Sequence, residues 1–121
     1  MRLSLVAIGC VANVLAVLRQ DSTYAPYRTG PALVALFNTV GFQDTYNYGA
    51  GVCDLGFTSR HAYTVARLRA LNGKPELSTV IEAALDRRLF EERGIRPAHA
   101  ARQVRNYLKP EGYSIRRVSG V

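Results

Sequence analysis

Cysteine, histidine and aspartate side chains are the groups in this sequence that could carry catalytic or metal chemistry. Cys10, Cys53, His61 and His99 stand far apart, without the paired close spacing that structural zinc sites use. The sequence therefore predicts no metal and no cofactor. Cys53 with either histidine could form a nucleophile and base, but a small buried cysteine is the commoner explanation.

Two aspartates lie in a long stretch, from Phe37 to Gly73, where glycine, aromatic and polar residues alternate without a simple period. Asp44 and Asp54 could act as an acid/base pair or hold a cation. Short acids also serve in turns and caps, and neither has another type of catalytic side chain nearby in a recognisable arrangement. We therefore favour structural roles for both and expect a packed loop, since its aromatic residues argue against disorder.

Positive charge is unevenly distributed along the 121 residues, whose formal net charge is +7. The first 60 residues carry four Lys/Arg against three acids, whereas the remainder carries twelve against six. Such asymmetry predicts an anionic partner, with nucleic acid first and an acidic protein or membrane surface after it. A solvated basic face that serves solubility is the alternative.

The candidate anion-binding residues lie near the C-terminus. Arg102, Arg105 and Lys109 have the i, i+3, i+7 spacing that places three cations on one outer face of a helix. Arg116 and Arg117 follow on a predicted strand. A helix followed by a basic strand is an arrangement that winged-helix modules offer to DNA, with phosphate contacts that make affinity sensitive to salt.

The elements that position these residues are predicted to be mainly α: four to five helices with a minor β element near the C-terminus. Residues 3–18 are apolar nearly all round, which is typical of a buried helix. Further helices are expected over residues 31–40 and 60–71, between Pro75 and Glu91, and over 97–109. A short strand is expected over 113–118.

Helical periodicity also predicts which residues of the 60–71 helix are buried. Its apolar stripe comprises Ala62, Val65, Leu68 and Leu71. The residues expected to point outward are Arg60, His61, Thr64, Arg67 and Arg69. Thr58 or Ser59 should cap this helix, and Asn72-Gly73 should end it.

Length and composition favour a single domain over residues 1–121 in a reducing cytoplasm. The two cysteines lie in segments expected to be buried, so no disulfide framework is indicated. The apolar run of residues 3–18 is short for a membrane span and lacks a signal-peptide cleavage pattern, so we expect no membrane association. So much apolar helix surface instead predicts homo-oligomer formation through residues 3–18.

Several short motifs are spaced along the middle of the chain: Phe37-Asn38, Gly41-Phe42-x-Asp44-x-Tyr46, Ser59-Arg60-x-x-Tyr63 and Asn72-Gly73. Near the end come Asn106-Tyr107-Leu108 and Gly112-Tyr113. Together they resemble the N-terminal domain of AbiJ-like abortive-infection proteins. The similar region covers residues 31–118, preceded by an N-terminal apolar helix and loop at 1–30.

The resemblance implies a recognition or adaptor domain of a bacterial phage-defence system, without a catalytic residue of its own. In such proteins the domain is usually joined to an effector, often a HEPN-type ribonuclease, which this chain is too short to contain. The spacing of Arg93 and His99 matches the ribonuclease pair superficially, but Gly94 and Pro97 predict a loop there rather than a rigid helix. A small nuclease or other enzyme using His99 or Asp44 is the alternative function.

Overall fold

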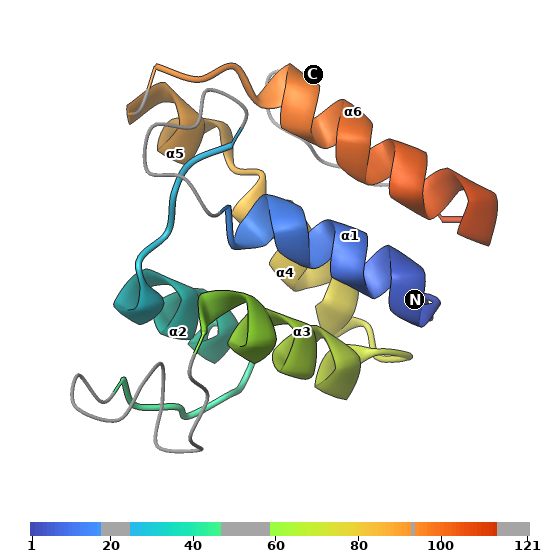
Figure 1. Cartoon of the computed structure of the whole chain (residues 1–121), viewed down its shortest axis with the longest axis horizontal. Helices are drawn as coiled ribbons and strands as arrows, with labels where there is room; N and C mark the ends of the chain where they lie inside the picture. The colour runs from blue at the N-terminus through green and yellow to red at the C-terminus, as the bar shows by residue number, and fades with distance from the viewer. Residues whose placement is uncertain (18–24, 47–58, 93, 114–121) are drawn as a thin grey trace.

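The apolar run near the N-terminus forms the helix around which the others are arranged. A computed structural model describes residues 1–17, 25–46, 59–92 and 94–113. In it α1 (Leu5–Leu15) lies between α6 (Pro97–Leu108), above it in Figure 1, and α3 (Arg60–Leu71), below it, and contacts both. Ser4 begins α1, because its hydroxyl accepts a hydrogen bond from the Ala7 backbone N–H at 3.2 Å.

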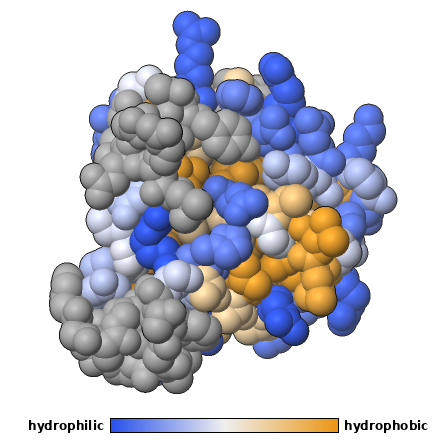
Figure 2. Space-filling view, in the orientation of Figure 1, coloured by the Kyte–Doolittle hydropathy of each residue, from blue (hydrophilic) through white to orange (hydrophobic). Residues whose placement is uncertain are grey.

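Most of α1 is buried within this one chain. Its buried residues are Ala7, Ile8, Val11, Ala12, Val14 and Leu15. By contrast, Leu5 and Val6 in its first turn are 65% and 78% exposed. Apolar surface is visible over α1 on the face shown in Figure 2. The nearly continuous apolar pattern is thus explained mainly by a central position, with a small apolar area left at one end.

Helix α2 (Gly30–Asn38) begins one residue before the predicted start, and α3 begins after its predicted cap. Thr29 caps α2 by accepting from the Ala32 N–H at 3.3 Å, and a proline stands in the first turn as expected. Ser59 caps α3 by accepting from the Ala62 N–H at 3.0 Å. Gly73 follows α3 with φ +86°, the left-handed geometry that ends a helix readily only at glycine.

The buried face of α3 differs from the predicted stripe. Leu68 and Leu71 are buried as expected, but Tyr63 and Thr64 are buried too, whereas Ala62 is exposed. The prediction that Thr64 points outward was therefore wrong. Its hydroxyl donates to the Arg60 carbonyl at 2.8 Å, which satisfies its polar group inside the helix and permits burial.

One predicted helix is divided into α4 (Glu76–Ala84) and the short α5 (Arg87–Glu92). The apolar residues of α4 are buried as the periodicity indicates. Asp86 causes the division, because its carboxylate accepts from the Arg88 backbone N–H at 2.8 Å and so begins a new helix. Apolar spacing continues across this break and does not reveal it.

Helix α6 is followed by the 3₁₀ turn η1 (Lys109–Glu111). Periodicity predicts five inward residues on this helix: Ala100, Ala101, Val104, Tyr107 and Leu108. Four of them are fully buried in the single core that the described helices share, whereas Tyr107 is half-buried against it. Regular secondary structure in residues 1–17, 25–46, 59–92 and 94–113 is entirely helical, which confirms the mainly α class. The strand expected over 113–118 lies, apart from Tyr113, outside the described residues.

The apolar α1 also bears on membrane association. Among the residues described, no helix combines the length and the apolar character that a membrane span requires.

Candidate functional site

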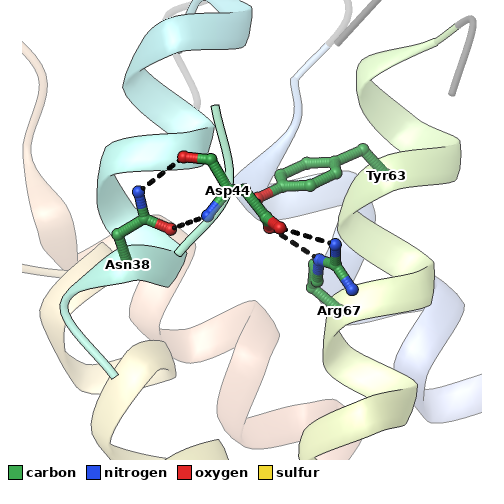
Figure 3. Close-up of polar contacts among 4 residues, drawn as sticks. All are labelled: Asn38, Asp44, Tyr63 and Arg67. Atoms are coloured by element: carbon green, nitrogen blue, oxygen red, sulfur yellow. Dashed lines mark hydrogen bonds and ion pairs between the residues drawn. The ribbon is translucent and has the colours of Figure 1, made fainter. Parts of the chain in front are cut away.

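Three of the predicted motif residues, Asn38, Asp44 and Tyr63, meet in one polar cluster that also includes Arg67 (Figure 3). The Asn38 amide makes two hydrogen bonds with the backbone of Asp44. Its Nδ2 donates to the Asp44 carbonyl at 3.0 Å, and its Oδ1 accepts from the Asp44 N–H at 3.0 Å. Asn38, at the end of α2, therefore closes the loop that follows and fixes Asp44 in place.

The Asp44 carboxylate is engaged on both oxygens. Its Oδ2 accepts from the Tyr63 hydroxyl at 2.7 Å and from Arg67 Nε at 2.8 Å, while its Oδ1 accepts from Arg67 Nη2 at 2.8 Å. The Arg67 and Asp44 side chains are only 13% and 12% exposed. This bidentate salt bridge between Asp44 and Arg67, together with the Tyr63 hydrogen bond, fixes the loop to α3 and is called the clasp below.

Aromatic rings enclose the clasp. The Arg67 guanidinium lies over the Phe42 ring at 4.7 Å from its centroid, and Phe37 packs edge-on against both Phe42 and Tyr63. Gly41, with φ +109°, makes the turn that brings Phe42 back toward α3. The loop from residue 39 to 46 is therefore packed, as predicted for the first part of the aromatic stretch.

Tyr63 is held in its protonated form in this cluster. Burial raises the pKa of its phenol, and the hydrogen bond to Asp44 together with that residue's negative charge raises it further. A phenol that must stay protonated and a carboxylate that already accepts three hydrogen bonds are poorly suited to exchange protons with a substrate. The arrangement supports a structural role for Asp44.

A second group of motif residues holds the N-terminal segment. Asn72 Oδ1 accepts from the Leu3 N–H at 2.7 Å and its Nδ2 donates to the Leu3 carbonyl at 2.9 Å. The Gly73 N–H donates to the Met1 carbonyl at 2.7 Å. The Tyr113 hydroxyl accepts from the Arg2 N–H at 3.0 Å. The end of α3 and the segment after α6 thus bind the residues that lead into α1.

A third group joins the ends of three helices. Arg60 donates from Nη1 to the Arg28 carbonyl at 2.9 Å and from Nη2 to the Val17 carbonyl at 2.8 Å, with its guanidinium 4.2 Å from the centre of the Tyr27 ring. Arg28 is itself buried and donates to the carbonyls of Leu15, at 3.2 Å, and Ala84. These carbonyls belong to the last residues of α1 and α4, so Arg28 caps two helix C-termini.

Tyr46, another of the motif residues, packs against the start of α2. Its ring lies so close to Gly30 that a side chain at this position would clash with it. Glycine at the start of α2 therefore permits the close approach of Tyr46. Most of the motif residues in the described ranges thus form contacts that hold loops against helices.

The predicted basic residues lie on α6 and just beyond it. Arg102 and Lys109 are exposed and Arg105 is half-buried. From Arg96 to Lys109 the sequence contains no acidic residue. Within the part of the chain that the structure describes, no hydrogen bond or ion pair engages the three cations of α6 and η1. Arg116 and Arg117 lie outside the described residues.

Comparison with known proteins identifies no relative. No protein-family model, curated protein or solved structure matches this chain.

Metal-ligating side chains do not gather in the described ranges. No group of three or more histidine, cysteine and acidic residues there is close enough to hold an ion. Cys10 is a free, half-buried thiol, while Cys53 and Asp54 lie outside the described residues. His99 stands exposed on α6, and His61 is half-buried on α3.

Three arginines at the centre of these contacts were not predicted to have such roles. Arg60 and Arg67 were expected to point outward, which was wrong: Arg60 is half-buried and binds the carbonyls of two other segments, and Arg67 pairs with Asp44 across 23 sequence positions. The i, i+4 spacing of Tyr63 and Arg67 places them on one helical face, and that spacing is the only local signal. No sequence signal marks Arg28, because its acceptors are helix ends brought together by tertiary packing.

Proposed function

We propose that this chain is a non-catalytic recognition domain that binds nucleic acid through the outer face of α6. The observation that carries the proposal is the α6 cation set, defined as Arg102, Arg105 and Lys109, which has no acidic neighbour in the helix and no ion-pair partner among the described residues. Unpaired cations on a rigid helix can form phosphate contacts without first breaking an internal ion pair.

The arrangement of Asp44 supports recognition over catalysis. The acid that an enzyme would use is bound by Tyr63 and Arg67, and the motif residues around it stabilise the fold. A recognition domain needs such a rigid scaffold behind its binding surface. A hydrolytic site instead needs an acidic or basic side chain that faces the substrate and can exchange a proton with it.

The resemblance to AbiJ-like N-terminal domains gives this proposal its biological setting. We propose that the domain acts in a bacterial abortive-infection or phage-defence system in the cytoplasm, where nucleic acid is the trigger and a separate effector protein is a partner. An acidic protein is the alternative partner for the same cations, and the duplex titration below tests the nucleic acid that we propose.

Substitution of the α6 cation set tests the proposed interface. Changing Arg102, Arg105 and Lys109 to glutamine should weaken binding to labelled RNA or DNA duplexes and lower the slope of log affinity against log salt by roughly 3 units, about one for each lost phosphate contact. Fluorescence anisotropy over a range of salt concentrations measures both effects. Circular dichroism should show an intact fold, because Arg102 and Lys109 are exposed, Arg105 is half-buried, and none of the three has an ion-pair partner among the described residues.

A matched triple variant controls for net charge. Changing Arg69, Lys74 and Arg88 to glutamine removes the same charge from exposed positions outside α6. This control should retain most of the affinity and slope. Equal weakening by both triple variants, or no measurable duplex binding at low salt, would refute the α6 interface.

A further inference from the structure

We infer that the open pocket beside Arg28 binds a small amphiphilic anion, with an acidic head at the arginine end and an apolar tail along α2. The pocket has a volume of about 380 Å³. This is within the range that small-molecule sites in proteins occupy. It lies among the segment before α2, α2 itself, and the α4–α5 region, and is independent of the α6 surface. The lining residues are Tyr27, Arg28, Thr29, Ala32, Ala35, Leu36, Thr39, Ala83 and Leu89.

One end of the pocket carries an arginine, and no acid among the described lining residues balances it. Arg28 is 5% exposed, and none of the residues that line the pocket is acidic. A guanidinium has five N–H donors. Two of those of Arg28 bind the carbonyls of Leu15 and Ala84, and the other three have no partner among the residues that the structure describes. The capped helix ends supply partial negative charge only, and no carboxylate among the described residues pairs with Arg28.

Neighbouring groups add to the positive potential at this end. Thr29, which caps α2, adjoins Arg28, so the positive end of the α2 dipole lies beside the arginine. Arg60 binds the Arg28 carbonyl and stacks on Tyr27, which fixes the backbone of this part of the wall. An anionic head is therefore favoured over a neutral or cationic one.

The rest of the wall is apolar. Ala32, Ala35 and Leu36 come from one side of α2, and Ala83 and Leu89 come from α4 and α5. Arg28 lines the same pocket as Ala83, and its guanidinium donates to the carbonyl of Ala84, the next residue in the sequence. A ligand with an acidic head and a short alkyl or aromatic tail matches this combination of one buried cation and small apolar side chains.

The titration behaviour of Arg28 agrees with this geometry. Burial lowers the pKa of its guanidinium to about 10. An anion held against it would stabilise the charged form and reverse part of that effect, which is a favourable contribution to binding.

Titration with octanoate below its micelle concentration tests the site. Octanoate should bind at least about tenfold more tightly than octanol, and octylamine should bind more weakly still, since a charge-assisted hydrogen bond separates acid from alcohol. Amide shifts in NMR spectra should concentrate on Ala32, Ala35 and Leu89. Octyl phosphate in a parallel titration distinguishes a phosphate head from a carboxylate head, and tight binding of either acid supports the site.

Variants that fill the pocket provide the decisive comparison. Ala35→Phe places a ring in the pocket from an exposed position on α2 and should abolish octanoate binding. Ala70→Phe makes the same change at an exposed helical position on α3 that does not line the pocket, and should bind octanoate like the wild type. Arg28→Gln, if circular dichroism shows it folded, should remove the preference for acid over alcohol.

Two results would overturn the proposal. One is equal binding of octanoate and octanol by the wild-type protein. The other is octanoate binding by Ala35→Phe that matches binding by Ala70→Phe. Neither result depends on whether α6 binds nucleic acid, because none of the pocket variants changes the α6 cation set.

Discussion

At the scale of single residues, the same type of side chain contributes very differently according to its burial. Arg67 and Arg88 each make a bidentate ion pair with an aspartate, but the Arg67 side chain is 13% exposed and the Arg88 side chain is 85% exposed. Removing one partner of a nearly buried pair leaves the other desolvated and unpaired, whereas an exposed pair is replaced by water at little cost.

We therefore expect Arg67→Ala to lower the free energy of unfolding by roughly 2 to 3 kcal/mol, through loss of the Asp44 partner and of packing on Phe42. The matched variant Arg88→Ala should change it by less than about 1 kcal/mol. Urea denaturation of both variants at neutral pH measures the difference. Equal destabilisation would mean that the clasp does not hold the loop to α3.

At the scale of elements, α1 connects the core to the surface. Its middle and end are buried against α3 and α6, while Leu5 and Val6 leave an apolar area at its first turn. Oligomer formation through residues 3–18 remains a proposal, and this first turn is the part of α1 that is available for it.

Replacing Leu5 and Val6 together by glutamine should convert an oligomer into a monomer without loss of helix content. The physical reason is that both side chains lie outside the core, so the substitution removes apolar surface and leaves no cavity. Sedimentation velocity at high micromolar concentration measures the change. A wild-type protein that is monomeric under these conditions would contradict self-association through α1.

At the scale of the whole molecule, the titrations of Tyr63 and Arg28 change the free energy of unfolding in opposite directions in alkaline solution. The folded pKa of Tyr63 is raised above its ordinary value of 10.0, so its stabilising contribution is fully present below pH 10 and is lost as the pH rises further. The folded pKa of Arg28 is lowered from 12.5 to about 10, so the unfolded chain binds the extra proton between those values. Arg28 therefore makes stability rise with pH in that window.

Tyr63→Phe should separate these contributions. Between about pH 9 and pH 11 Tyr63 should contribute a fall in the free energy of unfolding of at most roughly 1.4 kcal/mol per pH unit, which the rise from Arg28 opposes in the wild type. The variant lacks the Tyr63 contribution, so its free energy of unfolding should rise with pH relative to that of the wild type. Urea denaturation across this range gives the slopes, with Tyr107→Phe as the control. If Tyr63→Phe and the wild type show the same slope, Tyr63 does not retain its proton through this range.

Local sequence by itself determined where most helices begin and end and which residues of α4 and α6 face inward. Caps such as Ser59 and stops such as Gly73 act through neighbouring backbone groups, and apolar periodicity in α4 and α6 is strong enough to define one face. The short acid Asp86 was the exception: it divided one apolar pattern into two helices, because its cap competes with continued helix.

The contacts of Asp44, Arg67 and Arg28 depend on the tertiary structure. Asp44 and Arg67 were separate features of the sequence, one a loop acid and the other an outward cation, and only the return of the loop to α3 pairs them. Among the described residues Arg28 pairs with no acid, and it binds instead the carbonyl ends of two helices that packing brings together. Periodicity describes one element at a time, whereas both contacts depend on how separate elements are placed relative to one another.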